Sequence, residues 1–552
     1  MILGLSKIVI DTPIIPVAMK GYGDWKNRVK GKKTDLHVRC LYVNNESTPI
    51  FFINVEILMI SPSLKRSVLK DLKAYFSEVP ITDTNLMLTS QHTHSAPSGY
   101  SEYAFHTFTT PAISTVVFDA YKNAIIKAIV VAYQDSFEGS LSYVTGKFED
   151  EVPVAWNRSI KPYNKNPEVE PIAEDKRNLA LDRTMRMLVA KDVNGKIKGS
   201  VNWFGVHATC IGPKNKYISF DNKGYAAQFL ENDFKETIHL FAQGKSGDVS
   251  PHFHGPNMYA KRKEVAKKGD HLYAEENGKL QYIKAKEILA TRGKELSENL
   301  DAHLLYVDFT DVEIKPKYTI DDKPHHTTEA CIGAAMFRGT PIDGPGISKL
   351  EASLFIGINN LVNKKAKALK EVHGNKDIIL NVSTREFLGR GKLNVFPNFI
   401  DPQIKVANEM AKIGAVDEHS LVPTVLPIQL FIIGDIAIAG IPAEITTVAG
   451  KRLEESILTT LEGKVNEVII CNYANSYVGY ITTTEEYDCQ NYEGGHTIFG
   501  RHALGAFQTI FNDVAEELKL ERGKRSPSGI ENVPSFSKDQ LSLRTDWELP
   551  EV

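Results

Sequence analysis

Two histidines lie where a strand is expected to end. His92 and His94 belong to the stretch 86–97, into which apolar residues alternate. If the chain stays extended there, both imidazoles point to the same face, because strand side chains alternate with a period of two. Such a pair can hold a metal, or one ring can bind the metal while the other carries a proton. The same spacing also fits two hydrogen-bonded loop histidines, because short motifs often match by chance.

Four other segments each carry one residue that could do chemistry. Arg158 lies in a loop, where an arginine is usually solvated or ion-paired but can also donate to a developing oxyanion. His207 follows an apolar strand, and a single histidine there is more often structural than a ligand. Glu444 lies at a strand-to-helix junction, where a carboxylate is either a helix N-terminal charge or a metal ligand. Gly247 allows a sharp turn just before Ser250, which could expose that hydroxyl.

The elements that must position these residues follow an α/β order. Short β-rich runs at 38–43 and 50–56 precede a segment with helical spacing at 61–76. The His92 strand and a helix at 118–133 follow. Strands that alternate with helices predict an α/β domain.

Later segments repeat these signals. Two strands, 185–190 and 197–204, flank Asn194-Gly195, which is a strong hairpin signal. The apolar run 426–443 is interrupted by proline and glycine, so it predicts two buried strands joined by a turn and not a membrane helix. A charge-rich helix pair is expected within 259–299, and another helix at 503–518.

Composition excludes several classes of protein. Of 552 residues, 42% are hydrophobic and 24% are charged, which is typical of a soluble globular protein. The formal net charge of -3, without a long Lys/Arg run, argues against nucleic-acid binding. The 5 cysteines lack Cys-x-x-Cys spacing and predict neither a disulfide framework nor a cysteine zinc site. No secretory signal or transmembrane helix is recognised, which predicts a cytoplasmic protein or one whose export signal has been removed.

Eight motifs, taken in order, resemble the neutral/alkaline (non-lysosomal) ceramidase family. The resemblance extends over nearly the whole chain, from Gly21 to the helix after Tyr492. The motifs are His92-Thr93-His94-Ser95, Asn157-Arg158-Ser159, Asn202-Trp203-Phe204, Asp221-Asn222-Lys223-Gly224-Tyr225, Gly247-Asp248-Val249-Ser250-Pro251, Asp343-Gly344-Pro345-Gly346, Glu444-Ile445-Thr446-Thr447, and Tyr480-Ile481-Thr482-Thr483 with Tyr492-Glu493-Gly494.

The resemblance implies four zinc ligands, His92, His207, Glu444 and Tyr480. Two neutral imidazoles and a carboxylate suit Zn²⁺ and leave a position for water, and a phenol oxygen is an unusual additional ligand. Zinc lowers the pKa of bound water to about 7, which makes hydroxide available at neutral pH.

The same resemblance implies catalytic roles for four further residues. His94 would act as general base and acid, and Arg158 and Tyr492 would donate to the tetrahedral oxyanion. Ser250 matches the serine that the family treats as essential. Whether Ser250 attacks or only orients the substrate stays open. We favour the zinc-bound water as nucleophile, because no histidine–carboxylate pair is visibly arranged to activate the serine.

We expect a large three-layer α/β/α catalytic domain with a mixed central sheet over residues 1–520, and a C-terminal tail over 521–552. The zinc should lie at the carboxyl ends of the strands. Family members commonly carry a C-terminal immunoglobulin-like β-domain, for which this sequence leaves no room after about residue 520.

The predicted function is zinc-dependent cleavage of the N-acyl amide of ceramide to a fatty acid and sphingosine. The expected partner is a small lipid amide, with contact to a membrane surface and none to nucleic acid. One alternative is the same chemistry on another N-acylated amine or amino acid, and another is a non-catalytic lipid-binding homologue. Departures from the usual family residues at Gln91, Ser98, His252 and Gly495 surround the substrate in this interpretation, so they bear on acyl-chain and head-group preference.

Overall fold

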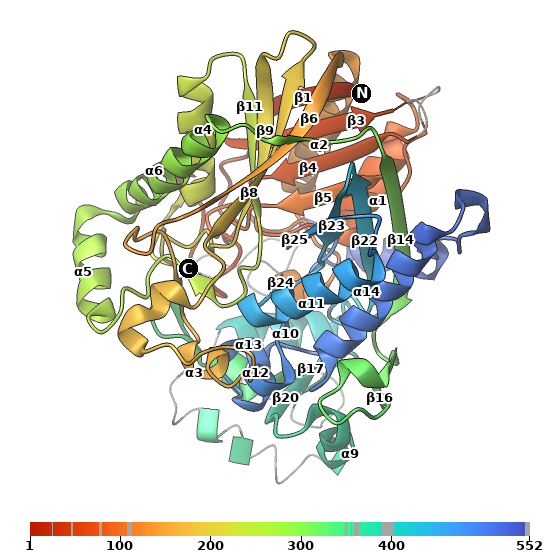
Figure 1. The fold of residues 1–552 in the computed structure, drawn as a ribbon. Coiled ribbons are helices and arrows are strands. Elements are labelled where there is room, and N and C mark those ends of the chain that lie inside the picture. The colour runs from red at the N-terminus through yellow and green to blue at the C-terminus, as the bar shows by residue number, and fades with distance from the viewer. Residues whose placement is uncertain are drawn as a thin grey trace.

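Two β-sheets face each other at the centre of the molecule (Figure 1). The computed structural model describes residues 1–24, 26–45, 48–76, 80–107, 113–347, 350, 352–354, 356–357, 364–387 and 402–546. Among these residues, no helix is both long and apolar enough to cross a membrane.

The larger sheet contains parallel and antiparallel strands. β4 pairs with β5 in parallel, as β9 does with β11, whereas its other pairs are antiparallel. β8 and β9 form the hairpin predicted at Asn194-Gly195. In spatial order the strands are β11 (Ile238–Gln243), β9 (Ile197–Phe204), β8 (Thr184–Asp192), β6 (Phe137–Lys147), β1 (Ile2–Ile10), β3 (Leu36–Asn44), β4 (Ile50–Val55) and β5 (Leu86–Ser90), with β13 (Lys294–Glu295) on β6.

The smaller sheet contains the most apolar run of the sequence. Its order is β14 (Leu300–Asp308), β22 (Val425–Ile433), β23 (Ile436–Gly440) and β25 (Glu467–Cys471). β22 and β23 are antiparallel and are joined at Gly434, whose φ of 64° is one that glycine adopts readily. The predicted pair of buried strands at 426–443 is therefore confirmed.

Side chains alternate between two different cores on both sheets. On β3, Leu41 and Val43 pack between the sheets, whereas Val38 and Cys40 pack with the helices α1 (Pro62–Leu72) and α2 (Thr115–Gln134). The smaller sheet follows the same rule. Phe431 of β22 lies between the sheets, and its even-numbered neighbours face α11 (Thr447–Thr460) and α14 (Ala503–Lys519).

The mixed α/β fold with a large mixed sheet flanked by helices is as predicted, but the three-layer arrangement is wrong. A second sheet lies between the large sheet and α11 and α14, so the order of layers is helix, sheet, sheet, helix. A strand that is buried on both faces is apolar throughout, and its sequence does not tell whether a helix or another sheet covers each face.

Further helices complete the outer layers. α4 (Asp221–Asp233) and α6 (Asp270–Leu289) cover β8, β9 and β11, and α5 (Met258–Lys268) precedes α6, which confirms the predicted helix pair. Further α-helices among the described residues are α3 (Ile160–Tyr163), α7 (Ala334–Phe337), α9 (Lys364–His373), α10 (Pro402–Lys412), α12 (Thr484–Asp488), α13 (Tyr492–Gly495) and α15 (Lys538–Ser542).

Short strand pairs lie around the ends of the main sheets. They are β2 (Gly31–Lys32) with β10 (Tyr217–Ile218), β7 (Trp156–Asn157) with β12 (Val249–Ser250), β15 (Glu313–Ile314) with β16 (His325–His326), β18 (Gly339–Thr340) with β19 (Gly344–Pro345), β24 (Glu444–Ile445) with β26 (Tyr480–Ile481), and the trio β17 (Cys331–Gly333), β20 (Ile378–Asn381) and β21 (Glu386–Phe387).

The predicted C-terminal tail packs against the rest of the chain as far as residue 546. Arg525 pairs with Asp301, with 2.6 Å between Nη2 and Oδ2. Arg544 is buried and donates a hydrogen bond to the backbone carbonyl of Glu102. The last residues of the tail lie outside the described residues.

Candidate metal centre and active site

Two histidines and a glutamate from three strand ends meet in the interior. His92 follows β5, His207 follows β9, and Glu444 begins β24 just after β23. One ligand atom from each of the three lies within 4.8 Å of the other two, and all three side chains are buried. We call this group the His-His-Glu cluster. A metal ion could be held there.

The backbone turns the two imidazoles toward the glutamate. The Nδ1 atom of His92 lies 2.8 Å from the Leu58 carbonyl oxygen, and that of His207 lies 2.8 Å from the Val249 carbonyl oxygen. A carbonyl only accepts, so each Nδ1 carries the proton and each Nε2 keeps its lone pair. The two Nε2 atoms lie 3.5 Å and 2.8 Å from the Glu444 carboxylate. This donor set, two neutral imidazoles and a carboxylate, fits zinc.

One buried side chain joins the two histidine loops. Gln243, the last residue of β11, donates from Nε2 to the backbone carbonyl of Gln91 at 3.0 Å and to that of Val206 at 2.7 Å. These carbonyls immediately precede His92 and His207. Gln243 therefore fixes the spacing of the two rings, a role that no sequence motif predicts.

The expectation of an extended chain through His92 and His94 is wrong. β5 ends at Ser90, and His92 has a φ of 70°, in the left-handed region. The two rings still meet, with their centroids 4.8 Å apart. Gly21 packs against His94, because a Cβ atom on Gly21 would lie 2.3 Å from its Nδ1. Neither ring nitrogen of His94 has a hydrogen-bond partner among the described residues.

Glu444 is not a helix N-terminal charge. α11 begins at Thr447, and its first turn contains no acidic residue. Instead the carboxylate accepts hydrogen bonds from the hydroxyls of Tyr473, at 3.2 Å, and Tyr477. Burial by itself raises the pKa of Glu444, but the nearby imidazoles, His92 first, outweigh it and hold the pKa well below 4.5. The carboxylate is therefore ionised, as a metal ligand must be.

Tyr480 lies beside Glu444 because β24 and β26 pair in parallel with these two residues in register. Its hydroxyl oxygen lies 3.4 Å from Nε2 of His207 and accepts a hydrogen bond from Nη2 of Arg158 at 2.9 Å. The ring of Tyr492 lies at 5.4 Å from that of Tyr480, between centroids. Both tyrosines thus border the His-His-Glu cluster.

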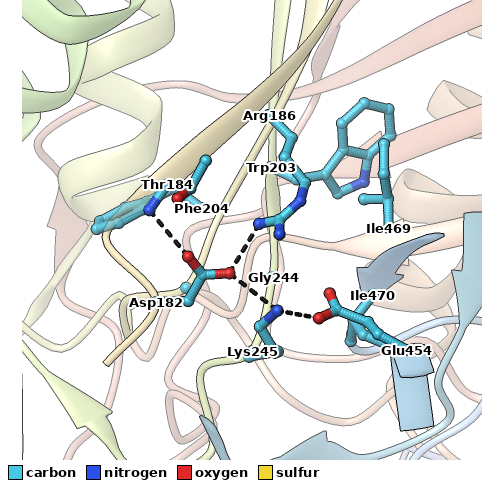
Figure 2. Close-up of a pocket in the computed structure, with 11 residues that line it drawn as sticks. Asp182, Thr184, Arg186, Trp203, Phe204, Gly244, Lys245, Glu454, Ile469 and Ile470 are labelled. Carbon is cyan, nitrogen blue, oxygen red and sulfur yellow. Dashed lines mark hydrogen bonds and ion pairs between the residues drawn. The ribbon is translucent and has the colours of Figure 1, made fainter. Parts of the chain in front are cut away.

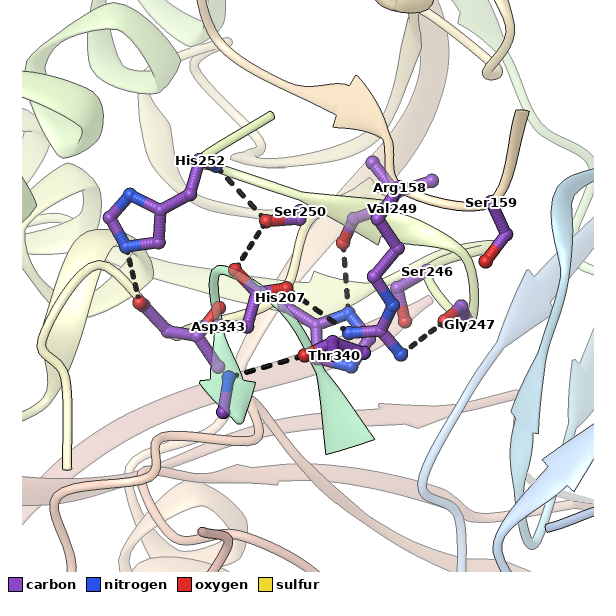
Figure 3. Close-up of polar contacts among 12 residues, drawn as sticks. Arg158, Ser159, His207, Ser246, Gly247, Val249, Ser250, His252, Thr340 and Asp343 are labelled. Atoms are coloured by element: carbon purple, nitrogen blue, oxygen red, sulfur yellow. Dashed lines mark hydrogen bonds and ion pairs between the residues drawn. The ribbon is translucent and has the colours of Figure 1, made fainter. Parts of the chain in front are cut away.

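Arg158 is neither solvated nor held by one simple ion pair (Figure 3). Its guanidinium donates to the Glu493 carboxylate at 2.8 Å, to Asp343 at 3.3 Å and to the Gly247 carbonyl at 2.9 Å. Its central carbon also lies 5.5 Å from the ring centroid of Tyr492. The guanidinium is therefore fixed in place before any ligand arrives.

Ser250 lies on β12 and contacts the other end of the same network. Its hydroxyl donates to Oδ1 of Asp343 at 2.7 Å and accepts from the backbone amide of His252 at 3.0 Å. Asp343 lies in the turn between β18 and β19, and its second oxygen is the one that Arg158 contacts. Ser250 and Arg158 are thus linked through one carboxylate.

The family model described as neutral/alkaline non-lysosomal ceramidase, N-terminal, matches residues 1–408 and 402–509. The chain belongs to this family. A neutral ceramidase of Pseudomonas aeruginosa is 30% identical over 98% of this chain and 75% of its own length. Neutral ceramidase B of Dictyostelium discoideum is 28% identical over 87% of this chain and 66% of its own length. A solved structure, a ceramidase complexed with C2, has a TM-score of 0.80 and 28% identity over 97% of this chain and 77% of that one.

Membership of the ceramidase family implies amide hydrolase activity. All eight side chains to which the resemblance gave a role lie at or next to the His-His-Glu cluster or in its polar network. Four residues of this network, Asp343, Glu493, Tyr473 and Tyr477, had no role predicted from the sequence. Asp343 and Glu493 belong to recognised motifs, which was a usable signal. The two tyrosines had none, because their shared contact is with Glu444, which lies far from them in sequence.

A separate group of charges anchors the loop that leads to Gly247 in this ceramidase-family fold (Figure 2). Nζ of Lys245 lies 2.9 Å from the Asp182 carboxylate and 2.5 Å from that of Glu454 on α11. Arg186 pairs with the same Asp182 at 2.7 Å. These charges pair with one another, so the side chains that line this pocket have a structural and not a catalytic role.

Proposed function

We propose that the chain is a zinc-dependent amidohydrolase that cleaves the N-acyl amide of ceramide to a fatty acid and sphingosine, with residues 1–520 as its catalytic domain. The observation that carries the proposal is the buried His-His-Glu cluster beside the fixed guanidinium of Arg158. The names of the relatives, neutral ceramidases, support the choice of substrate.

Zinc would be held by His92, His207 and Glu444, with the phenol of Tyr480 as an additional oxygen. When bound, zinc lowers the pKa of a water molecule and polarises a carbonyl group, and both effects favour amide hydrolysis. Tyr473 and Tyr477 orient the Glu444 carboxylate for this role.

His94 accepts the proton of the attacking water and passes it to the leaving amine. Burial is the main cause that lowers the pKa of His94 well below 6.5, so its ring is neutral near pH 7 and able to accept a proton. The absence of a hydrogen-bond partner for either ring nitrogen among the described residues keeps both available.

Arg158 and Tyr492 stabilise the oxyanion that develops on the amide carbonyl. Four acceptors hold the guanidinium, so it needs no reorganisation when charge develops. Ser250 orients the substrate and does not attack it. Its hydroxyl proton is directed at Asp343, and no imidazole contacts that hydroxyl in the described part of the chain.

A product assay by mass spectrometry tests this proposal. Purified protein is incubated with long-chain ceramide as isolated, after chelation and after zinc is restored, beside an N-acyl amino acid of matched chain length. Sphingosine release that chelation abolishes and zinc restores is the expected result. Hydrolysis of the acyl amino acid alone would agree with the proposed mechanism but contradict ceramide as the substrate. Hydrolysis of neither amide by zinc-loaded protein would contradict both the mechanism and the substrate.

A further inference from the structure

One buried carboxylate contacts two residues of the proposed active site (Figure 3). Oδ1 of Asp343 accepts the hydroxyl proton of Ser250 at 2.7 Å, and Oδ2 accepts a hydrogen bond from Nη1 of Arg158 at 3.3 Å. The turn that carries Asp343 is closed without this side chain, because the amide of Gly344 donates to Oγ1 of Thr340 at 3.2 Å. The carboxylate of Asp343 therefore holds residues of the site and not its own turn.

The hydrogen bonds of Ser250 leave its hydroxyl oxygen one free lone pair. A serine hydroxyl has one proton and two lone pairs. The proton is donated to Asp343, and one lone pair accepts the backbone amide of His252 at 3.0 Å. A ligand can therefore only donate a hydrogen bond to Ser250 and cannot accept one from it.

The hydrogen bonds of Arg158 leave its guanidinium one free N–H group. A guanidinium has one proton on Nε and two on each terminal nitrogen. Nε donates to Glu493, Nη2 to the Gly247 carbonyl and the Tyr480 hydroxyl, and Nη1 to Asp343. The second proton of Nη1 has no acceptor among the described residues. The free N–H group is thus on the nitrogen that Asp343 holds.

A free donor and a free acceptor on either side of one carboxylate match the two polar atoms of a secondary amide. We propose that Asp343 is a positioning residue for the scissile amide. It directs the free N–H group of Arg158 to the carbonyl oxygen of the amide and the free lone pair of Ser250 to the N–H group of the amide. This inference rests on the proposed amidohydrolase function and narrows its substrates to secondary amides, the class to which ceramide belongs.

The pairing implies a preference against amides without an N–H group. An N-methylated amide would leave the buried lone pair of Ser250 without a donor, and an unpaired buried acceptor is costly. A hydroxyl group of the sphingoid base is a second source of such a donor. We assign the lone pair to the amide N–H group, because the carbonyl that faces Arg158 then belongs to the same group.

Competition kinetics on zinc-loaded protein test this role of Asp343. N-hexanoylsphingosine and its N-methyl derivative each compete with a fluorogenic ceramide, which gives an apparent affinity for both whether or not they are cleaved. We expect wild type to favour the N–H compound at least about tenfold. Asp343→Asn replaces one acceptor oxygen with an NH₂ group, so the preference should fall below about threefold. Asp343→Ala serves if that variant does not fold.

Asp301→Asn is the matched control. Asp301 is also buried, at 8% exposed, and also pairs with an arginine, Arg525, at 2.6 Å. The control should retain both the preference and kcat, whereas kcat for N-hexanoylsphingosine should fall at least about tenfold in Asp343→Asn, because the free N–H group of Arg158 is no longer directed at the oxyanion. A preference that is absent from wild type, or unchanged in the Asp343 variants, would overturn the proposal.

Calorimetric titration separates this proposal from the amidohydrolase function. If zinc-loaded wild type hydrolyses no amide, the proposed function fails, and the two affinities are then measured by titration of the same protein. The preference of at least about tenfold, and its loss in the Asp343 variants, are expected there too. Equal affinities of wild type for the two compounds would overturn the positioning role.

A third compound distinguishes the two sources of the donor. N-hexanoylsphingosine without its primary hydroxyl group retains the amide N–H group, so we expect its affinity to be unaffected by Asp343→Asn relative to the parent compound. An Asp343-dependent loss of affinity for this compound, without one for the N-methyl derivative, would assign the lone pair of Ser250 to the head group. That result would overturn the assignment to the amide.

Discussion

Each oxygen of the Glu444 carboxylate lies near one imidazole and accepts a hydrogen bond from one tyrosine hydroxyl. In metal sites, partners that orient a ligand commonly contribute about 10–100-fold to metal affinity. We therefore expect Tyr477→Phe to weaken zinc binding by about 10–100-fold, measured by competition with a chromogenic chelator. Tyr75→Phe is the control, because Tyr75 is 59% exposed. Unchanged zinc affinity in Tyr477→Phe would show that the tyrosine does not orient the ligand.

Arg158 gives a second prediction at the scale of one residue. Lysine keeps the charge but cannot reach all four acceptors that fix the planar guanidinium in place. We expect Arg158→Lys to lower kcat by about 10²–10³-fold, the range found when one oxyanion donor is removed. Zinc content by elemental analysis should stay unchanged. A variant with normal kcat would exclude Arg158 as an oxyanion donor.

The matched control for Arg158→Lys is Arg186→Lys. Arg186 is also paired with two carboxylates, those of Asp182 and Glu467. It belongs with Asp182 to the separate ion-pair group shown in Figure 2. Replacing Arg186 with lysine should lower the free energy of unfolding and leave kcat near that of the wild type. A similar loss of kcat in both variants would point to a general structural effect.

Among the elements, the turn around Gly21 holds His94 in place. Gly21 has a φ of 128°, and a Cβ atom there would enter the His94 ring. Gly23 has a φ of 66°, and beyond its chain neighbours no atom of the described residues lies within 4 Å of its Cβ position. Both alanine variants should lose about 1 kcal/mol of unfolding free energy from backbone strain. We expect only Gly21→Ala to lose most of its amidase activity as well. Urea unfolding and steady-state kinetics on the two variants measure these effects.

Equal activities of Gly21→Ala and Gly23→Ala would contradict this account. Such a result would mean that His94 can move without effect, and hence that it is not the group that transfers the proton.

At the scale of the whole molecule, the His-His-Glu cluster joins both sheets. His92 and His207 follow strands of the larger sheet, whereas Glu444 follows β23 of the smaller one. An ion that binds only the folded state stabilises it by about 2.7 kcal/mol at 100 times its Kd. We therefore expect zinc to raise the Tm and chelation to lower it, measured by differential scanning fluorimetry.

Glu444→Gln should abolish the zinc-dependent shift in Tm, because the charged ligand from the smaller sheet is lost. Glu455→Gln on α11 is the control, because the side chain of Glu455 is 64% exposed and its loss should leave the shift intact. A zinc-dependent shift that persists in Glu444→Gln would place the ion elsewhere.

Local sequence was enough to predict much of the secondary structure and the candidate residues. The turn at Asn194-Gly195 and the interrupted run 426–443 gave a hairpin each, because turn chemistry and apolar periodicity act over a few residues. The ordered motifs named the family and, with it, residues that the fold brings together. None of the single motifs identified a metal centre, because each also fits an ordinary structural role.

Only the tertiary structure decided what each buried group faces. Arg158 and Glu493 are in contact across 335 positions of the chain, and Tyr477 reaches Glu444 across 33. The second sheet was missed for the same reason. Apolar periodicity reports that a face is buried, but the partner that covers it comes from a distant segment, and only the packed chain brings the two together.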